Sequence, residues 1–194
     1  MGGLHLEVTK NPKRFDPKSQ WVRYRDGLWI PSRKRTYLYW FKFLQHAERS
    51  PDHQVDWTQY DGWGGANVVL GTKFDEWWEE RWKELFATKV KGEQPKFPLS
   101  TDRPKPDGIR YALLIYENQH RGSNWDIAVW VQKQEEKKRY GVQSFFFADD
   151  TRNERGHLEV GAEDKMIIQS RVGRYKQAAN RYLKGVCEGK FPVS

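Results

Sequence analysis

Four basic side chains near the end of the sequence are spaced so that a helix would bring them to one side. Residues 170–186 read SRVGRYKQAANRYLKGV, and successive helical residues turn by about 100°. An apolar stripe then contains Ile168, Val172, Tyr175, Ala179, Tyr182, Leu183 and Val186. The basic residues nearly opposite that stripe are Arg171, Arg174, Arg181 and Lys184. Guanidinium and ammonium groups bind phosphates, and guanidinium groups also bind guanine edges. The pattern favours a helix that binds nucleic acid, with duplex DNA as the expected ligand, over a merely solvated helix face.

A second group of basic residues lies in the first 35 residues, where Pro12, Pro17 and Pro31 disfavour a long helix. This segment is predicted to be an extended basic arm that adds salt-dependent phosphate contacts. Its rings, Trp21, Tyr24 and Trp29, would either stack on bases or dock on the core. The arm residues predicted to bind nucleic acid are Arg23, Arg25, Arg33, Lys34 and Arg35.

The overall charge agrees with a polyanionic partner. The 194 residues include 34 Lys and Arg against 26 Asp and Glu, which gives a net charge of +8. The mean hydropathy of −0.95 indicates a polar chain, yet 15% of the residues are aromatic and ten are Trp. A folded core built from rings is therefore expected, in one large domain or two small ones.

Residues that could carry catalysis are few and scattered. Asp52 and His53 form one candidate, and a second set that could hold Mg²⁺ in a nuclease-like site consists of Asp149, Asp150, Glu154, His157 and Glu159. The arginines, asparagine and glycine interspersed in that second set are typical of a surface loop. Cys187 is expected to be a packed, inert thiol, and WGGANVVLG lacks the lysine of a phosphate-binding loop. We therefore expect no metal, no cofactor and no enzymatic activity.

The single cysteine cannot form an intramolecular disulfide, and neither a signal segment nor a run of about 18 apolar residues occurs. These features predict an intracellular, cytoplasmic protein that has no membrane partner.

The first half of the chain predicts an aromatic-rich helical unit over residues 36–88. Tyr37, Trp40, Phe41, Leu44 and Ala47 follow helical spacing, and Pro51 ends that helix. Thr72 is expected to cap a second helix, KFDEWWEERWKELF, whose first turn carries Asp75 and Glu76. The apolar stripe of this second helix contains Phe74, Trp77, Trp78, Trp82, Leu85 and Phe86.

Residues 89–107 contain four prolines and predict a linker to a second unit over 108–194. There, GIRYALLIYENQHRG ends a first helix at Gly122, and Ser123 with Asp126 is a capping-box-like start of a second helix. The fold class is therefore mainly α. Because IRYALLIY and WDIAVWVQ are rich in β-branched and aromatic residues, strand is the alternative for 109–132, and the class would then be α+β. An insert, 132–167, contains GVQSFFFADD, which predicts a small strand or hairpin.

Gly122, Ser123, Asp126, Ile127 and Ala128 resemble the turn and second helix of helix-turn-helix proteins of the sigma-factor region 4 type. The third helix of that family is similar to the later set of Val172, Arg174, Tyr175, Ala178 and Leu183. The resemblance covers about residues 109–131 and 168–188, and it implies a helix-turn-helix unit that binds DNA. The arginine face and the capped turn together favour a DNA-binding protein such as a regulator of transcription or a mobile-element accessory factor. Residues 132–167 separate the two helices, whereas the family has only a few residues there.

Two other functions remain open. A protein–protein adaptor would use Trp57, Tyr60 and Trp63 as an exposed aromatic anchor, although these rings would alternatively fill a gap between helices. A single-strand or RNA binder would stack bases on Trp21, Tyr24 and Trp29.

Overall fold

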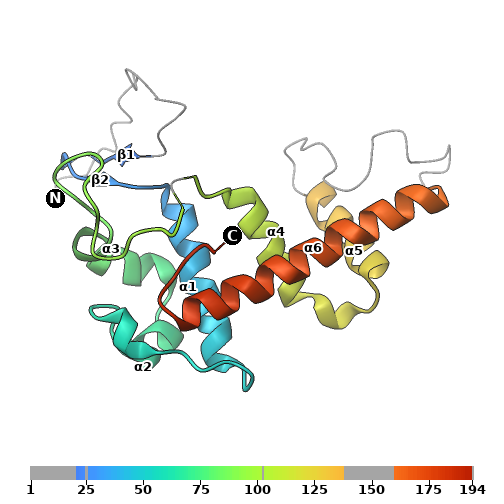
Figure 1. The fold of residues 1–194 in the computed structure, drawn as a ribbon, viewed down its shortest axis with the longest axis horizontal. Helices are drawn as coiled ribbons and strands as arrows, with labels where there is room; N and C mark the ends of the chain where they lie inside the picture. Colours follow the sequence, from blue (N-terminus) through green and yellow to red (C-terminus); the bar gives the residue numbers. More distant parts are fainter. Residues whose placement is uncertain (1–20, 25, 102, 138–159, 194) are drawn as a thin grey trace, which may run out of the picture.

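The computed structural model of this chain describes residues 21–24, 26–101, 103–137 and 160–193. These residues form six α-helices, two short 3₁₀ turns and one two-stranded antiparallel sheet (Figure 1). The predicted mainly α class is confirmed.

The described part of the basic arm is a hairpin. Strand β1 (Val22–Arg23) pairs with β2 (Trp29–Ile30), and Trp29 exchanges two backbone hydrogen bonds of 2.9 and 2.8 Å with Thr88. The Tyr24 ring lies 4.5 Å from that of Trp82, so this part of the arm docks on the helical body. The small sheet is therefore in the arm, whereas the strand predicted within 141–150 lies outside the described residues.

Helix α1 (Lys34–Arg49) forms the centre of the aromatic core. It buries all five residues that helical spacing predicted, from Tyr37 to Ala47, and it also buries Tyr39 and Phe43. A helix buried on more than one side must be surrounded by other elements. The helix ends at Arg49, just before Pro51, as predicted.

Three short elements follow: η1 (Trp57–Tyr60), α2 (Gly65–Gly71) and α3 (Phe74–Leu85). The prediction that Thr72 caps α3 is wrong. Its backbone N–H instead donates to the Val68 carbonyl at 3.0 Å and closes α2, and Lys73 occupies the N-cap of α3 without a side-chain hydrogen bond. Asp75 and Glu76 do lie in the first turn of α3, where the helix dipole favours carboxylates.

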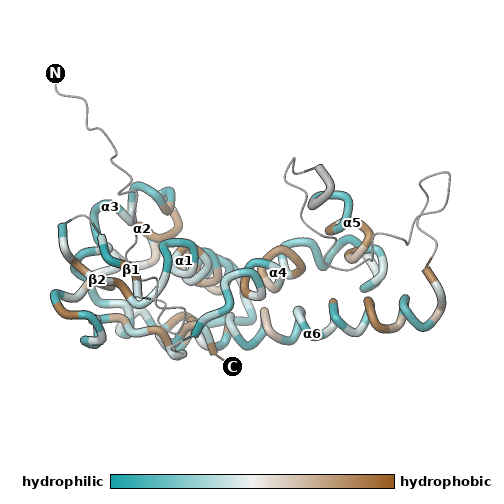
Figure 2. Tube along the Cα trace, turned by 90° about the horizontal axis from the view of Figure 1, so that it is seen from above, coloured by the Kyte–Doolittle hydropathy of each residue, from teal (hydrophilic) through white to brown (hydrophobic). Residues whose placement is uncertain are grey.

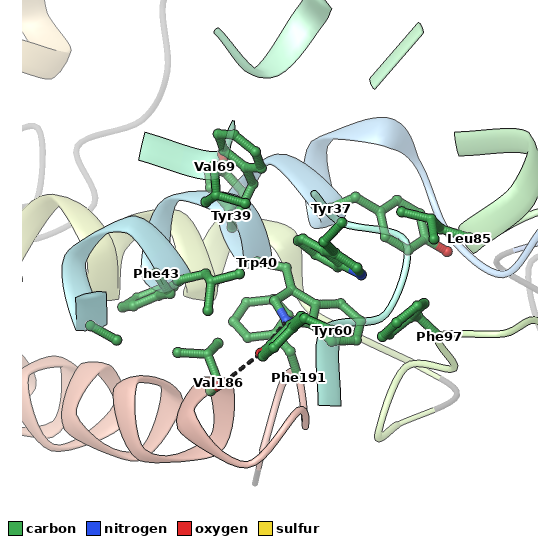
Figure 3. Packing of buried hydrophobic residues seen from close by; sticks show 14 of the residues in the cluster. Tyr37, Tyr39, Trp40, Phe43, Tyr60, Val69, Leu85, Phe97, Val186 and Phe191 are labelled. Atoms are coloured by element: carbon green, nitrogen blue, oxygen red, sulfur yellow. Dashed lines mark hydrogen bonds between the residues drawn. The ribbon is translucent and has the colours of Figure 1, made fainter. Parts of the chain in front are cut away.

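Residues of α1 and α3 pack with the C-terminal segment in one cluster, and Figure 3 shows Leu85 of α3 there with rings of α1. Trp40 stacks on Phe191 with 5.6 Å between ring centroids, and Figure 3 shows Phe191 between Trp40 and α6. The buried Tyr60 hydroxyl donates to the backbone carbonyl of Val186 and accepts from the Trp40 indole at 3.3 Å. The C-terminal part of α6 is therefore fixed to the aromatic core by both packing and hydrogen bonds.

Residues 89–107, which the sequence predicts to be a linker, pack along this core. Phe97 is buried, and its N–H donates to the Leu85 carbonyl at 3.0 Å. Three residues later, the Ser100 N–H donates to the Phe191 carbonyl at 2.9 Å.

The second half contains α4 (Pro106–Glu117), η2 (Gln119–Arg121), α5 (Asn124–Lys137) and α6 (Ala162–Cys187). Residues 109–132 are thus helical apart from the turn, and the strand alternative is wrong. The predicted capping box is confirmed: the Ser123 N–H donates to the Asp126 carboxylate at 2.9 Å, and the Asp126 N–H donates to the Ser123 hydroxyl at 3.3 Å. Gly122 precedes it at φ +121°, a conformation that side-chain-bearing residues rarely adopt.

A second, smaller cluster joins α4, α5 and α6; it contains Tyr111, Ile115, Ile127, Ala128, Val131, Ile168 and Val172. Helices α4 and α6 contribute to both clusters, because Ile109, Ala112, Ala179 and Leu183 belong to the aromatic one. Figure 2 shows α6 along one edge of the molecule, with α4 and α5 on one side of it. One long helix therefore joins the two hydrophobic clusters and leaves its other side exposed.

Candidate nucleic-acid interface

The structure places the four basic residues predicted on α6 on its exposed side. Arg171, Arg174, Arg181 and Lys184 are all exposed, and none of them forms an ion pair or side-chain hydrogen bond within the described residues. The opposite stripe is buried as predicted: Ile168, Val172, Ala179, Leu183 and Val186 lie in the two clusters, and the rings of Tyr175 and Tyr182 are half-buried.

Two uncharged, exposed residues line up with these basic side chains, and neither was predicted from the sequence. Ser170 and Gln177 lie four residues before and three residues after Arg174, so they share its side of the helix. We call the resulting set the polar row; it consists of Ser170, Arg174, Gln177, Arg181 and Lys184, all exposed. Arg171 flanks the row. Ser170 and Gln177 carry no charge to mark them in the sequence, although their helical spacing places them in line with Arg174.

Acidic residues occur only at the ends of this helix. Glu163 and Asp164 lie in its first turn, and Glu188 follows its last residue. The Glu188 carboxylate is itself 3.1 Å from the Lys190 ammonium. Between these ends the sequence has no acidic side chain and six basic ones, namely Lys165, Arg171, Arg174, Lys176, Arg181 and Lys184. A strongly positive potential along the row follows from this distribution.

Two glycines mark where neighbouring segments approach the row from its two flanks. A Cβ added at Gly173 would lie 3.6 Å from the amide nitrogen of Asn124, which itself donates to the Gln169 carbonyl at 3.2 Å. A Cβ added at Gly185 would lie 2.8 Å from the Lys190 carbonyl. Helical rotation puts the two glycines on opposite sides of the polar row. The start of α5 and the C-terminal segment thus border the row and leave it open between them.

Charges of the row affect the tyrosines beneath it. Burial raises the pKa of Tyr175, with a smaller contribution from Tyr111, and the positive charges of Arg171 and Arg174 oppose that rise. Burial likewise raises the pKa of Tyr182, and Arg181 opposes it. Both phenols therefore stay neutral at physiological pH, so the side of α6 that faces the core adds no negative charge next to the row.

The N-terminal basic residues have different surroundings. The Lys34 ammonium lies 2.8 Å from Asp75 and 3.4 Å from Glu79, and the Arg35 guanidinium lies 2.9 Å from Asp107. These ion pairs join α1 to α3 and to α4. They count against phosphate contacts by Lys34 and Arg35, although exposed ion pairs of this kind contribute little energy.

The remaining arm residues do not join the polar row either. Arg23 lies over the Trp29 ring, 5.7 Å from its centroid, while Arg33 is exposed at the N-cap of α1 and Arg25 lies outside the described residues. Helix α6 meets α1 near Phe43, whose ring is 5.3 Å from that of Tyr182. That contact is nine residues, about 13 Å of helix, from the start of α1. The structure thus gathers the α6 residues and keeps the arm residues apart from them.

The aromatic anchor of the adaptor hypothesis is not exposed. Tyr60 and Trp63 are buried in the aromatic cluster, and the half-buried Trp57 donates its indole N–H to the Glu48 carboxylate at 2.9 Å. These rings fill the space between helices, which was the alternative interpretation of that loop.

Metal-binding and nucleophilic groups are sparse in the part of the chain that the structure describes, where no three His, Cys, Asp or Glu side chains gather closely enough to hold a metal ion. The acidic set from Asp149 to Glu159 lies outside those residues. Burial raises the pKa of the Cys187 thiol, with a smaller contribution from Glu188, which lowers its nucleophilicity at neutral pH. None of the described helices is both long enough and apolar enough to cross a membrane.

No protein-family model, curated protein or solved structure matches this chain.

Proposed function

We propose that this chain is a non-enzymatic DNA-binding protein that places the exposed side of α6 against duplex DNA. Its binding would regulate transcription or assist a mobile genetic element. The observation that carries the proposal is the set of exposed basic side chains, without an ion pair in the described part of the chain, on one side of a helix whose opposite side is buried in two hydrophobic clusters.

A fixed helix is a favourable platform for this ligand. Because α6 is held by packing along both clusters, little backbone order has to be gained when it binds. Arg171 and Lys184 are thirteen residues apart, which corresponds to about 20 Å of helix and to about six phosphate steps of one strand. Phosphate contacts along that length would supply affinity that decreases with salt.

The unit formed by α4, the turn and α5 packs against the buried side of α6. The capping box of Ser123 and Asp126 fixes the start of α5, and Ile127 and Val172 bring α5 and α6 together in the second cluster. We propose that this helix-turn-helix-like unit braces α6 on the duplex, with Arg23 and Arg33 adding peripheral phosphate contacts.

The experiment that tests this proposal measures binding to a fluorescent 20-base-pair duplex of random sequence over a salt series. The variant carries Arg171→Ala, Arg174→Ala and Arg181→Ala. A matched control carries Lys73→Ala, Lys89→Ala and Arg103→Ala, three exposed basic residues outside α6 that have no ion pair within the described residues. Both variants lose three positive charges.

We expect the α6 variant to lose at least tenfold in affinity at low salt, and the slope of log K against log salt to decrease by about 0.9 per lost phosphate contact. The control should lose much less. Equal losses in the two variants would mean that only net charge matters and would contradict the proposed interface. A wild-type protein that binds no duplex at low salt would overturn the function itself, and stronger binding to a single-stranded probe would favour the ring-stacking alternative.

A further inference from the structure

We infer that α6 recognises base edges in the major groove, and that Gln177 determines specificity for an adenine between two guanines. This inference depends on the proposed function and extends it from phosphate binding to sequence recognition. It rests on the composition and placement of the polar row.

The centre of the polar row is suited to base recognition. Arg174, Gln177 and Arg181 are exposed and lie on the side of α6 opposite the buried stripe. Arginine donates two hydrogen bonds to O6 and N7 of guanine, and glutamine pairs with N6 and N7 of adenine. A surface that bound only phosphates would need charge, whereas Gln177 is uncharged and stands between two arginines.

The spacing of these side chains matches the base-pair repeat. Arg174 and Arg181 are seven residues apart, which is about 10.5 Å along the helix. That length corresponds to about three base-pair steps of 3.4 Å, with Gln177 near the middle. The predicted site therefore contains two guanines about three base pairs apart and an adenine between them, on either strand.

The shape of the exposed side also fits a groove. A helix with its side chains is about 10–12 Å wide, and the major groove is about 12 Å wide. The neighbouring segments approach α6 at Gly173 and Gly185, on the two flanks of the row, and leave its centre open. Arg171 on one flank and Lys184 near the end of the row are then placed for the phosphates that border the groove.

The test is selection of preferred sequences from a randomised duplex pool, followed by affinity measurements on the selected duplex and on a random duplex. The variants are Gln177→Ala, Arg171→Ala and, as a matched control, Gln119→Ala, which removes an exposed glutamine from the turn after α4. All three side chains are exposed, so folding should be retained, and circular dichroism checks this.

We expect the wild type and Gln119→Ala to select the same site. Gln177→Ala should lose the adenine preference, with about a five- to hundredfold loss on the selected duplex and less than a twofold change on the random duplex. Arg171→Ala should lower the affinity for the selected duplex and for the random duplex by the same factor.

Three results would overturn the inference. Duplex binding without any selected sequence would refute base recognition and leave the proposed function standing. A selected sequence that Gln177→Ala retains would refute the assignment of Gln177. Absence of duplex binding would refute the inference and the proposed function together.

Discussion

Glu188 lies in line with the polar row, four residues beyond Lys184, and places a carboxylate where a phosphate would approach. Its Lys190 partner is exposed and screens it only in part. We expect Glu188→Gln to raise affinity for random duplex about two- to fivefold at low salt, since one repulsive charge is removed, and to have little effect at high salt. Anisotropy titrations at two salt concentrations measure this. Glu93→Gln, at an exposed position of the 89–107 segment, is the control and should change affinity less; equal gains would contradict a local effect.

The hydroxyl of Tyr60 connects the aromatic cluster to the end of α6. Burial raises the pKa of Tyr60, so the hydroxyl remains a donor to the Val186 carbonyl while it accepts from Trp40. Tyr60→Phe leaves the Trp40 indole without a hydrogen bond in a buried site and removes one of the hydrogen bonds to the Val186 carbonyl. We expect it to lower the free energy of unfolding by about 1–3 kcal/mol in urea titrations. Tyr116→Phe, at a half-buried phenol without a hydrogen bond in the described residues, should cost less than about 0.5 kcal/mol; a similar loss in both would refute the role of the hydroxyl.

Between elements, a side-chain hydrogen bond joins α1 to α4. The His46 imidazole is 3.0 Å from the Glu117 carboxylate, and this hydrogen bond, aided by Lys42, holds the pKa of Glu117 below its usual value. A lowered carboxyl pKa stabilises the fold above the unfolded-state pKa, about 4.3, and this stability is lost as pH falls through the folded-state pKa. Glu117→Gln should therefore cost less than about 1 kcal/mol at pH 6 and nothing at the acidic end. Urea titrations from pH 6 to pH 3 measure the difference, and a constant difference across that range would contradict this linkage.

The close approach of the C-terminal segment to α6 predicts whether a Gly→Ala substitution there stabilises or destabilises the fold. Ala normally stabilises a helix relative to Gly by about 1 kcal/mol. At Gly185 the new Cβ would lie 2.8 Å from the Lys190 carbonyl and 2.9 Å from Val193, so we expect Gly185→Ala to destabilise by about 1–3 kcal/mol. Gly108→Ala in α4 meets only Lys105, at 3.9 Å, and should be neutral or stabilising. Thermal melting of both variants decides this, and a stabilised Gly185→Ala would contradict the packing described.

Helical periodicity in the sequence predicted the elements that depend on local pattern. The aromatic spacing located α1 and α3, the Ser123–Asp126 pair located the start of α5, and the alternation of arginines with apolar residues located the two sides of α6. These signals depend on residues within a few turns of one another.

Contacts between distant segments could not be predicted in this way. The β1–β2 hairpin is held by Thr88, about sixty residues away, and Phe97 of the proline-rich segment is buried by rings from elsewhere in the chain. The carboxylates that pair with Lys34 and Arg35 come from α3 and α4. Tertiary structure therefore separates the basic residues of the arm from those of α6, although both segments are rich in Lys and Arg.

At the scale of the whole molecule, the two hydrophobic clusters share α4 and α6, and we expect them to unfold in one transition. Ile127→Ala removes a fully buried side chain of the smaller cluster and should cost about 2–4 kcal/mol. Tryptophan fluorescence, dominated by the aromatic cluster, and hydrogen exchange of α5 peptides should then shift together in urea. If α5 opened at lower urea than α1, the two units with a linker predicted from the sequence would describe the molecule better.

The polar row and the buried stripe occupy opposite sides of α6, and no residue of the row belongs to either cluster. Substitutions in the row are thus decoupled from folding. The preferred DNA sequence could be changed by exchanging a few outward-facing side chains of α6. Such variants would differ in recognition but would keep the same fold and a similar free energy of unfolding.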